Sequence, residues 1–186
     1  MHIEIDQSGK IEQLNKDTAI AFSNKTQYSV LIQKDVKQKL FKIYKGKVKE
    51  LRYRLFCIGV YFCLKDYIKE KELATICCEY IGKENLIKSF LLDYLIRDYL
   101  SINPKIIRFG KIGKQSNAHA VAIDVFRGNR RPNRILSLSE VEKWLKKMLF
   151  GGRAVPAFFP IIRIFHNAYW RGNTLHQRTV TRLIPL

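Results

Sequence analysis

The spacing of apolar residues changes period several times over the first 110 residues, and these changes constrain the fold more than any single motif does. At the N-terminus, Ile3 and Ile5 alternate with polar residues, which predicts a short strand ending at a QSGK turn. A second strand is expected over residues 10–14. It either resumes at 18–22 or is followed there by a further strand, and another strand is expected over 28–32. The chain therefore opens with antiparallel strands joined by turns.

Helical and strand-like periods alternate from residue 34 onward. A helical stretch with a break at Gly46 is expected over 34–69, because apolar residues recur there every three or four positions. The apolar run from Leu73 to Glu79 predicts a strand buried on both faces. Further elements are expected in the order helix 84–99, strand 105–109, helix 117–126 with Ser116 as its cap, and helix 137–148 with capping-box spacing at Ser139 and Glu142.

This order predicts an α/β domain with a mixed five-stranded sheet, in which an antiparallel meander precedes two parallel crossover units, and with flanking helices. The composition changes after about residue 150. No acidic residue follows Glu142, and no lysine follows Lys147, while five arginines occur between residues 151 and 186. We expect a domain over 1–150 and a basic appendage over 151–186. The appendage is either a loosely ordered arm or sequence from beyond the reading frame of a damaged gene, as in a mobile-element remnant.

The charge of the chain points to an anionic partner. Thirty-four Lys and Arg residues against sixteen Asp and Glu residues give a formal net charge of +18. Such a field concentrates polyanions at the surface, so nucleic acid is the leading partner. The alternative is that lysine is frequent throughout the source genome, because Lys and Ile also dominate segments here that look purely structural.

Neither a membrane span nor a zinc site is expected from the sequence. The apolar run from Leu55 to Leu64 is too short to cross a bilayer, and the N-terminus lacks the apolar segment of a signal peptide, so we expect a cytoplasmic protein. The four cysteines lie inside apolar segments without C-x-x-C spacing, which predicts small core residues; they are Cys57, Cys63, Cys77 and Cys78.

Three acidic residues stand out by their positions: one at the end of the first predicted strand, one at the end of the fourth, and one on the helix after the fifth. They are Asp6 in IEIDQSGKIE, Glu79 in ATICCEYIG and Asp124 in NAHAVAIDVF. With these residues and this order of elements, the chain resembles the ribonuclease H-like superfamily of nucleases and integrases over about residues 1–126. The resemblance implies that the first and fourth strands lie parallel and adjacent in the middle of the sheet. It also implies that an acidic metal site lies at their carboxyl ends.

The resemblance implies a nuclease that uses Mg²⁺ or Mn²⁺ to hydrolyse RNA or DNA, with Asp6, Glu79 and Asp124 as ligands. Hard divalent cations prefer oxygen ligands, and they can activate water and stabilise the leaving oxygen of a phosphodiester. His119 would assist proton transfer or orient a phosphate. Simpler interpretations remain open: Asp6 capping its turn, Asp124 facing water and His119 as a surface histidine. The chain departs from the superfamily in two ways. Its fourth strand ends in Glu79, where Asp is more common, and only Asp35 lies near the start of the first long helix, where the superfamily commonly has an acidic residue.

Basic residues in two loops flank the helix that carries Asp124, and we expect them to contact the phosphate backbone. They are Lys111, Lys114, Arg127, Arg130, Arg131 and Arg134. No aromatic residues are interleaved with them, which argues against base stacking. Two other functions remain open: a non-catalytic basic nucleic-acid-binding protein with the same fold, and a degenerate mobile-element protein.

Overall fold

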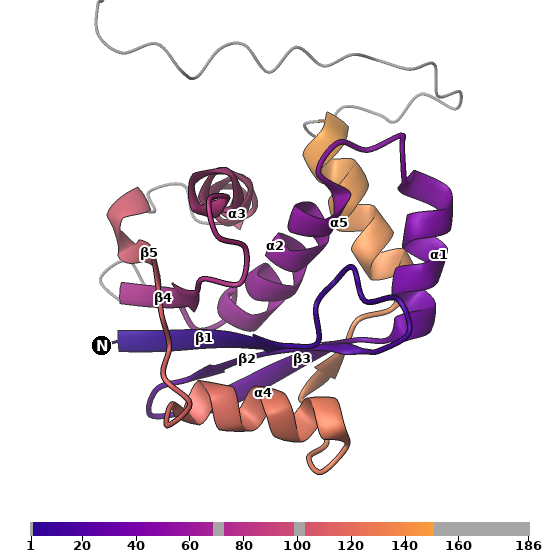
Figure 1. The fold of residues 1–186 in the computed structure, drawn as a ribbon. Coiled ribbons are helices and arrows are strands. Elements are labelled where there is room, and N and C mark those ends of the chain that lie inside the picture. The colour runs from indigo at the N-terminus through magenta and orange to yellow at the C-terminus, as the bar shows by residue number, and fades with distance from the viewer. Residues whose placement is uncertain (1, 69–72, 99–102, 151–186) are drawn as a thin grey trace, which may run out of the picture. The chain divides into compact units, whose positions relative to one another are not determined.

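The structure is a computed structural model that describes residues 2–68, 73–98 and 103–150 of the chain. The predicted basic appendage at 151–186 lies outside the described residues. Within them, a mixed sheet is covered by helices on both faces (Figure 1). The predicted α/β class is therefore confirmed.

Six strands form the sheet, in the order β5-β4-β1-β2-β3-β6. Their bounds are β1 (His2–Ser8), β2 (Thr18–Ser23), β3 (Gln27–Ile32), β4 (Leu73–Cys77), β5 (Ile107–Gly110) and β6 (Arg134–Ile135). Strands β1, β2 and β3 form the predicted antiparallel meander. The expected parallel pairing of the first and fourth strands is confirmed, with Ile5 opposite Ile76. The prediction of five strands was wrong, because β6 pairs with β3 through only two residues, too few to show a period.

One helix lies on one face of the sheet and four lie on the other (Figure 1). The single helix is α4 (Asn117–Arg127), which packs on β1, β2 and β3. The opposite face carries α1 (Lys34–Tyr44), α2 (Leu51–Leu64), α3 (Glu84–Asp98) and α5 (Leu138–Phe150). A short 3₁₀ turn, Pro104–Ile106, precedes β5, so the strand expected at 105–109 begins later and ends at Gly110.

The second strand differs from the prediction, whereas the predicted break in the first helical stretch is present. Residues 10–14 form turns, with the Gln13 amide donating to the Lys10 carbonyl at 3.1 Å, and the second strand begins only at Thr18. The break expected at Gly46 in the helical stretch 34–69 is confirmed, because this stretch forms two helices, α1 and α2. Gly46 takes a left-handed φ of 78° and Glu50 one of 58°, and these angles end the first helix and reorient the chain before the second.

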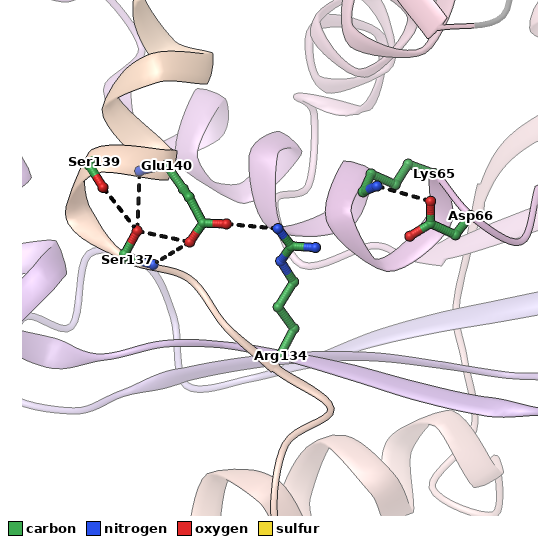
Figure 2. A network of polar contacts seen from close by, with 6 residues as sticks. All are labelled: Lys65, Asp66, Arg134, Ser137, Ser139 and Glu140. Atoms are coloured by element: carbon green, nitrogen blue, oxygen red, sulfur yellow. Dashed lines mark hydrogen bonds and ion pairs between the residues drawn. The ribbon is translucent and has the colours of Figure 1, made fainter.

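The cap of α5 lies two residues before the predicted pair. Ser137 and Glu140 form the capping box: the Glu140 amide donates to Ser137 Oγ at 3.3 Å, and the Ser137 amide donates to the Glu140 carboxylate at 3.0 Å (Figure 2). The same carboxylate accepts a hydrogen bond from Arg134 of β6 at 2.7 Å. This ion pair ties the sixth strand to the start of the helix.

Two hydrophobic clusters lie on the two faces of the sheet. The larger is built from long aliphatic and aromatic side chains of the sheet and of the helices on its face, among them Phe22, Phe56 and Tyr61. The smaller lies under α4 and consists of Ala19, Ala21, Leu31, Val121, Ala122 and Val125. Small side chains let α4 approach the sheet closely. Two acidic residues of β1, Glu4 and Asp6, therefore lie against the first turn of this helix.

Candidate metal centre at the ends of β1 and β4

The alternation of β1 sends its acidic residues to the α4 side of the sheet. Ile3 and Ile5 are buried in the larger cluster, so Glu4 and Asp6 point to the opposite face. Gly9 ends the strand in a tight turn at φ 75°, and a Cβ there would lie 2.3 Å from the Asp17 carbonyl oxygen. Only glycine fits this turn without displacing its neighbours.

Two contacts fix α4 against β1. Ser116 caps the helix, since its Oγ accepts a hydrogen bond from the Ala118 amide at 3.1 Å, as the sequence predicts. The same hydroxyl donates to a Glu4 carboxylate oxygen at 2.6 Å. One turn along, His119 Nδ1 lies 2.7 Å from Asp6 Oδ2. Asp6 is only 5% exposed, so this histidine is a close polar partner of a buried carboxylate.

Asp6, Cys77 and Glu79 form a compact group of ligand atoms, all within 4.8 Å of one another. Their proximity follows from the parallel register: Ile5 lies opposite Ile76, so the following residues Asp6 and Cys77 are also neighbours. Glu79 lies two residues beyond the end of β4 and is half-buried. The structure thus brings together two of the three predicted carboxylates.

Cys77 corrects the prediction that all four cysteines are core residues. Cys57 and Cys63 are fully buried, as predicted, but Cys77 and Cys78 are only half-buried. The reason is that β4 alternates between buried and half-buried residues instead of being buried on both faces. Helix α4 packs on β1, β2 and β3, and it leaves the outer face of β4 less covered.

The electrostatics of the group favour a cation or a shared proton. Burial raises the pKa of Glu79, and the charge of Asp6 raises it further, while a hydrogen bond from Cys77 and the charges of Lys10 and His119 act in the opposite direction. Burial also raises the pKa of the Cys77 thiol to about 12, with contributions from Asp6 and Glu79. Two carboxylates this close repel each other, and a bound cation would relieve that repulsion.

Asp124 is not part of this group, in the residues that the structure describes. It follows His119 by five residues on α4, which rotates its side chain by about 140° from the direction of His119. Its main-chain carbonyl accepts hydrogen bonds from the amides of Asn129 and Arg130, at 2.9 and 3.2 Å, where the chain leaves the helix. The helix therefore presents His119 to Asp6, and Asp124 elsewhere.

The predicted basic residues lie in two places: near the group formed by Asp6, Cys77 and Glu79, and at the C-terminal end of α4 and in β6. Lys111 and Lys114 are exposed in the loop between β5 and α4. This loop adjoins the group, because the Cys78 amide donates to the Gly110 carbonyl at 3.1 Å. Arg127 and Arg131 are exposed at the other end of α4.

The other two arginines have structural partners. Arg130 donates to the Gln27 side chain at 2.8 Å, at the start of β3. Arg134 lies in β6, where it pairs with Glu140 and lies 4.5 Å from the centre of the Phe62 ring. The prediction that Arg134 lies in a basic loop was therefore wrong.

Sequence reasoning missed two residues of this region, Cys77 and Lys10. Cys77 was hidden in an apolar run, although aligning the predicted parallel strands by their ends would have placed it beside Asp6. Lys10 is an exposed cation whose charge acts on Glu79, and the sequence places it at the end of the QSGK turn. Its position in the turn after Asp6 is the signal that would have found it.

No protein-family model, curated protein or solved structure matches the chain. In the part of the chain that the structure describes, no helix has the length and apolar character needed to cross a bilayer.

Proposed function

We propose that this protein is a divalent-metal-dependent nuclease that acts on RNA or DNA, with Asp6 and Glu79 as the carboxylates of its metal centre. The observation that carries the proposal is the meeting of these two side chains at the carboxyl ends of two adjacent parallel strands. They are 73 positions apart in the sequence: Asp6 lies in β1, and Glu79 follows the end of β4. Local turn chemistry at either residue does not explain their meeting.

The topology supports a ribonuclease H-like fold. That resemblance implies a meander followed by parallel strands, with the first and fourth strands adjacent, and the sheet has the strand sequence β3-β2-β1-β4-β5 within its order. It also implies an acidic centre where β1 and β4 end. The sixth strand is an addition at the β3 edge and does not alter this arrangement.

The donor set fits a divalent cation. Asp6 and Glu79 supply the carboxylate oxygens that Mg²⁺ and Mn²⁺ prefer, and the mutual repulsion of the two groups favours an ion between them. Such an ion, when bound, would lower the pKa of a water and stabilise the leaving oxygen of a phosphodiester. His119 would hold Asp6 in its orientation, in the way that residues behind a ligand commonly do.

The positive charge of the chain supports a polyanionic substrate. Lys10 acts on Glu79, and Lys111 and Lys114 lie in the loop that adjoins the group. Cations beside a carboxylate centre can hold phosphates on either side of the bond that is cleaved. The proposal therefore assigns these three lysines to the phosphate backbone, without base recognition.

The proposal is tested by calorimetric titration of Mg²⁺ and Mn²⁺ into the full chain and into Glu79→Gln. We expect the substitution to weaken metal binding by about 100-fold or more, since loss of residues that merely support a ligand costs about 10- to 100-fold. Asp66→Asn is the matched control, because Asp66 is exposed and pairs with Lys65. Asp124→Asn distinguishes two kinds of centre. It leaves metal binding unchanged if the centre has two carboxylate ligands, and it weakens binding if Asp124 is the third ligand that the resemblance implies. Equal affinity in wild type and Glu79→Gln would contradict the proposal.

Cleavage of labelled RNA, DNA and hybrid duplexes separates this function from a second candidate, a non-catalytic basic nucleic-acid-binding protein. The observation that favours the second candidate is that Asp124 does not join the group of Asp6, Cys77 and Glu79, which has two carboxylates among the residues that the structure describes. If nucleic acid binds with a steep salt dependence while no substrate is cleaved with either metal, the second function holds.

A further inference from the structure

The thiol of Cys77 is the feature of the proposed centre that a magnesium site does not explain. Its Sγ lies within 4.8 Å of carboxylate oxygens of both Asp6 and Glu79. The side chain is half-buried and contacts both carboxylates, so it belongs to the group rather than to the core behind it. Magnesium takes oxygen ligands in octahedral geometry and gains nothing from sulfur.

We infer that Cys77 is a metal ligand, and that the centre therefore selects a zinc-class divalent ion over magnesium. The inference rests on the metal centre proposed above and goes further by naming the class of ion. Zinc binds carboxylate oxygen and thiolate sulfur together, and its catalytic sites commonly use three protein ligands with a fourth position left for water or substrate. Asp6, Cys77 and Glu79 supply a set of this kind.

The spacing of the three groups suits this ion. Tetrahedral zinc holds oxygen at about 2.0 Å and sulfur at about 2.3 Å, which places its ligand atoms roughly 3.5 Å apart. Ligand atoms within 4.8 Å of one another would need to approach by no more than about 1.3 Å to reach this spacing. On binding, the sulfur–hydrogen bond breaks, a metal–sulfur bond forms, and the proton passes to solvent.

The other groups around the centre have supporting roles. His119 contacts Asp6 through Nδ1, so the carboxylate lies between the imidazole and the proposed ion. Histidine and carboxylate pairs of this kind orient ligands in zinc proteins, usually with the histidine on the metal. Here the order is reversed, and the carboxylate would be the ligand. Cys78 lies next to Cys77 in sequence but is not in the group, which provides a matched control.

The test uses cobalt as a spectroscopic probe for zinc, because a cobalt–thiolate bond gives a charge-transfer band that carboxylate ligands do not. The full chain, Cys77→Ser, Cys78→Ser and Glu79→Gln are titrated with Co²⁺, and then with Zn²⁺ and Mg²⁺ by calorimetry. We expect the band in wild type and Cys78→Ser, and its loss in Cys77→Ser. We also expect Zn²⁺ to bind wild type at least about 100-fold more tightly than Mg²⁺, and Cys77→Ser to lose most of that preference while its Mg²⁺ affinity stays within about threefold.

Two results would overturn the inference, and they differ in what they leave standing. If no band forms and Cys77→Ser binds every ion as wild type does, while Glu79→Gln weakens binding, the thiol is not a ligand but the carboxylate centre survives. If neither Cys77→Ser nor Glu79→Gln changes the affinity for any ion, both the inference and the proposed nuclease centre fail. Circular dichroism and urea unfolding of each variant establish that it is folded before titration.

Discussion

The two faces of the sheet are built from different kinds of side chain. One face supplies most of the apolar burial, and the other carries the polar residues of the candidate site. Strand β2 shows this most directly, since Phe22 is buried in the larger cluster while the adjacent Ala21 lies under α4. The larger face is filled by long aliphatic and aromatic groups. The α4 face has small residues at its centre and polar groups at its rim, where Ser116 and His119 meet Glu4 and Asp6.

This arrangement follows from what each face must do. Large side chains remove the most apolar area from water, so the face with four helices supplies most of the burial. Alanines leave room for a backbone to approach, and that approach lets a side chain from the first turn of α4 reach a buried carboxylate. The metal centre proposed above depends on this close contact rather than on apolar area.

The largest effect on stability is expected on the larger face. Phe22→Ala removes a fully buried ring that lies 4.8 Å from the ring of Tyr67, measured between centroids. We expect the free energy of unfolding to fall by about 3–5 kcal/mol, because the deletion leaves a cavity that the neighbours fill only in part. Urea denaturation followed by circular dichroism measures the change. Metal affinity of the folded variant should stay close to that of wild type.

Ala21→Val is the matched control on the other face of the same strand. The added methyl groups press on α4, and overpacking of this kind costs about 1–3 kcal/mol. Since Ala21 lies opposite Asp6 in the sheet, we expect this variant to weaken metal binding although it loses less stability. If Phe22→Ala weakened metal binding more than Ala21→Val does, the separation of the two faces would not hold.

An effect smaller than that of Phe22→Ala is expected at Lys37, a fully buried cation of α1. Its ammonium donates to the carbonyl oxygens of Lys10 and Gln13 and to Thr18 Oγ1, at 3.0, 2.8 and 2.9 Å. Lys37→Met would leave two carbonyl groups without their donor, and we expect a loss of about 2–3 kcal/mol in urea denaturation. A loss below about 0.5 kcal/mol would contradict this role.

The same variant tests a dependence on pH. Burial lowers the pKa of Lys37 from 10.5 to about 8, although the carboxylates of Asp17 and Glu12 act in the opposite direction. Between these two pH values the unfolded chain binds more protons at this residue than the folded chain does, so its contribution to stability increases with pH. The advantage of wild type over Lys37→Met should therefore grow from about pH 8 to pH 10.5. A constant difference across that window would contradict the lowered pKa.

The sequence predicts the strands whose two faces differ in polarity. It does not predict the burial of residues that depends on elements distant in the sequence. Alternation places Ile3 and Ile5 on one face of β1, and a hydroxyl before an apolar helix identifies Ser116 as its cap. Both are local signals. The meeting of Asp6 and Glu79 also follows, once the first and fourth strands are expected to pair in parallel.

The rest depends on packing that no local pattern shows. Cys77 is part of an apolar run in sequence, and only the position of α4, which packs on β1 to β3, leaves it half-buried beside Asp6. The rotation of α4 is fixed by Val121, Ala122 and Val125 against the sheet, and this rotation presents His119 rather than Asp124 to Asp6. The five-residue spacing of His119 and Asp124 already indicates that they do not share one helix face.

The smallest effect, and the sharpest comparison, is expected at the two helix caps. Ser116→Ala removes the side-chain cap of α4 and its hydrogen bond to Glu4, and Ser137→Ala removes the corresponding cap of α5 on the opposite face. Loss of a serine cap typically costs about 1 kcal/mol, so the two variants should lose similar stability in urea. Only Ser116 positions the turn that carries His119. We therefore expect Ser116→Ala alone to weaken metal binding, by a few-fold, because His119 would hold Asp6 less firmly.

A result in which both cap variants bind metal as wild type does would show that Asp6 keeps its orientation without α4. Equal weakening in both would indicate that metal binding follows overall stability, so that the α4 face has no separate role. Unequal stability losses are corrected by titrating at a temperature where each variant is fully folded. Under that condition the lost capping energy no longer changes the fraction of folded protein. A difference in metal affinity therefore reports the contact between His119 and Asp6.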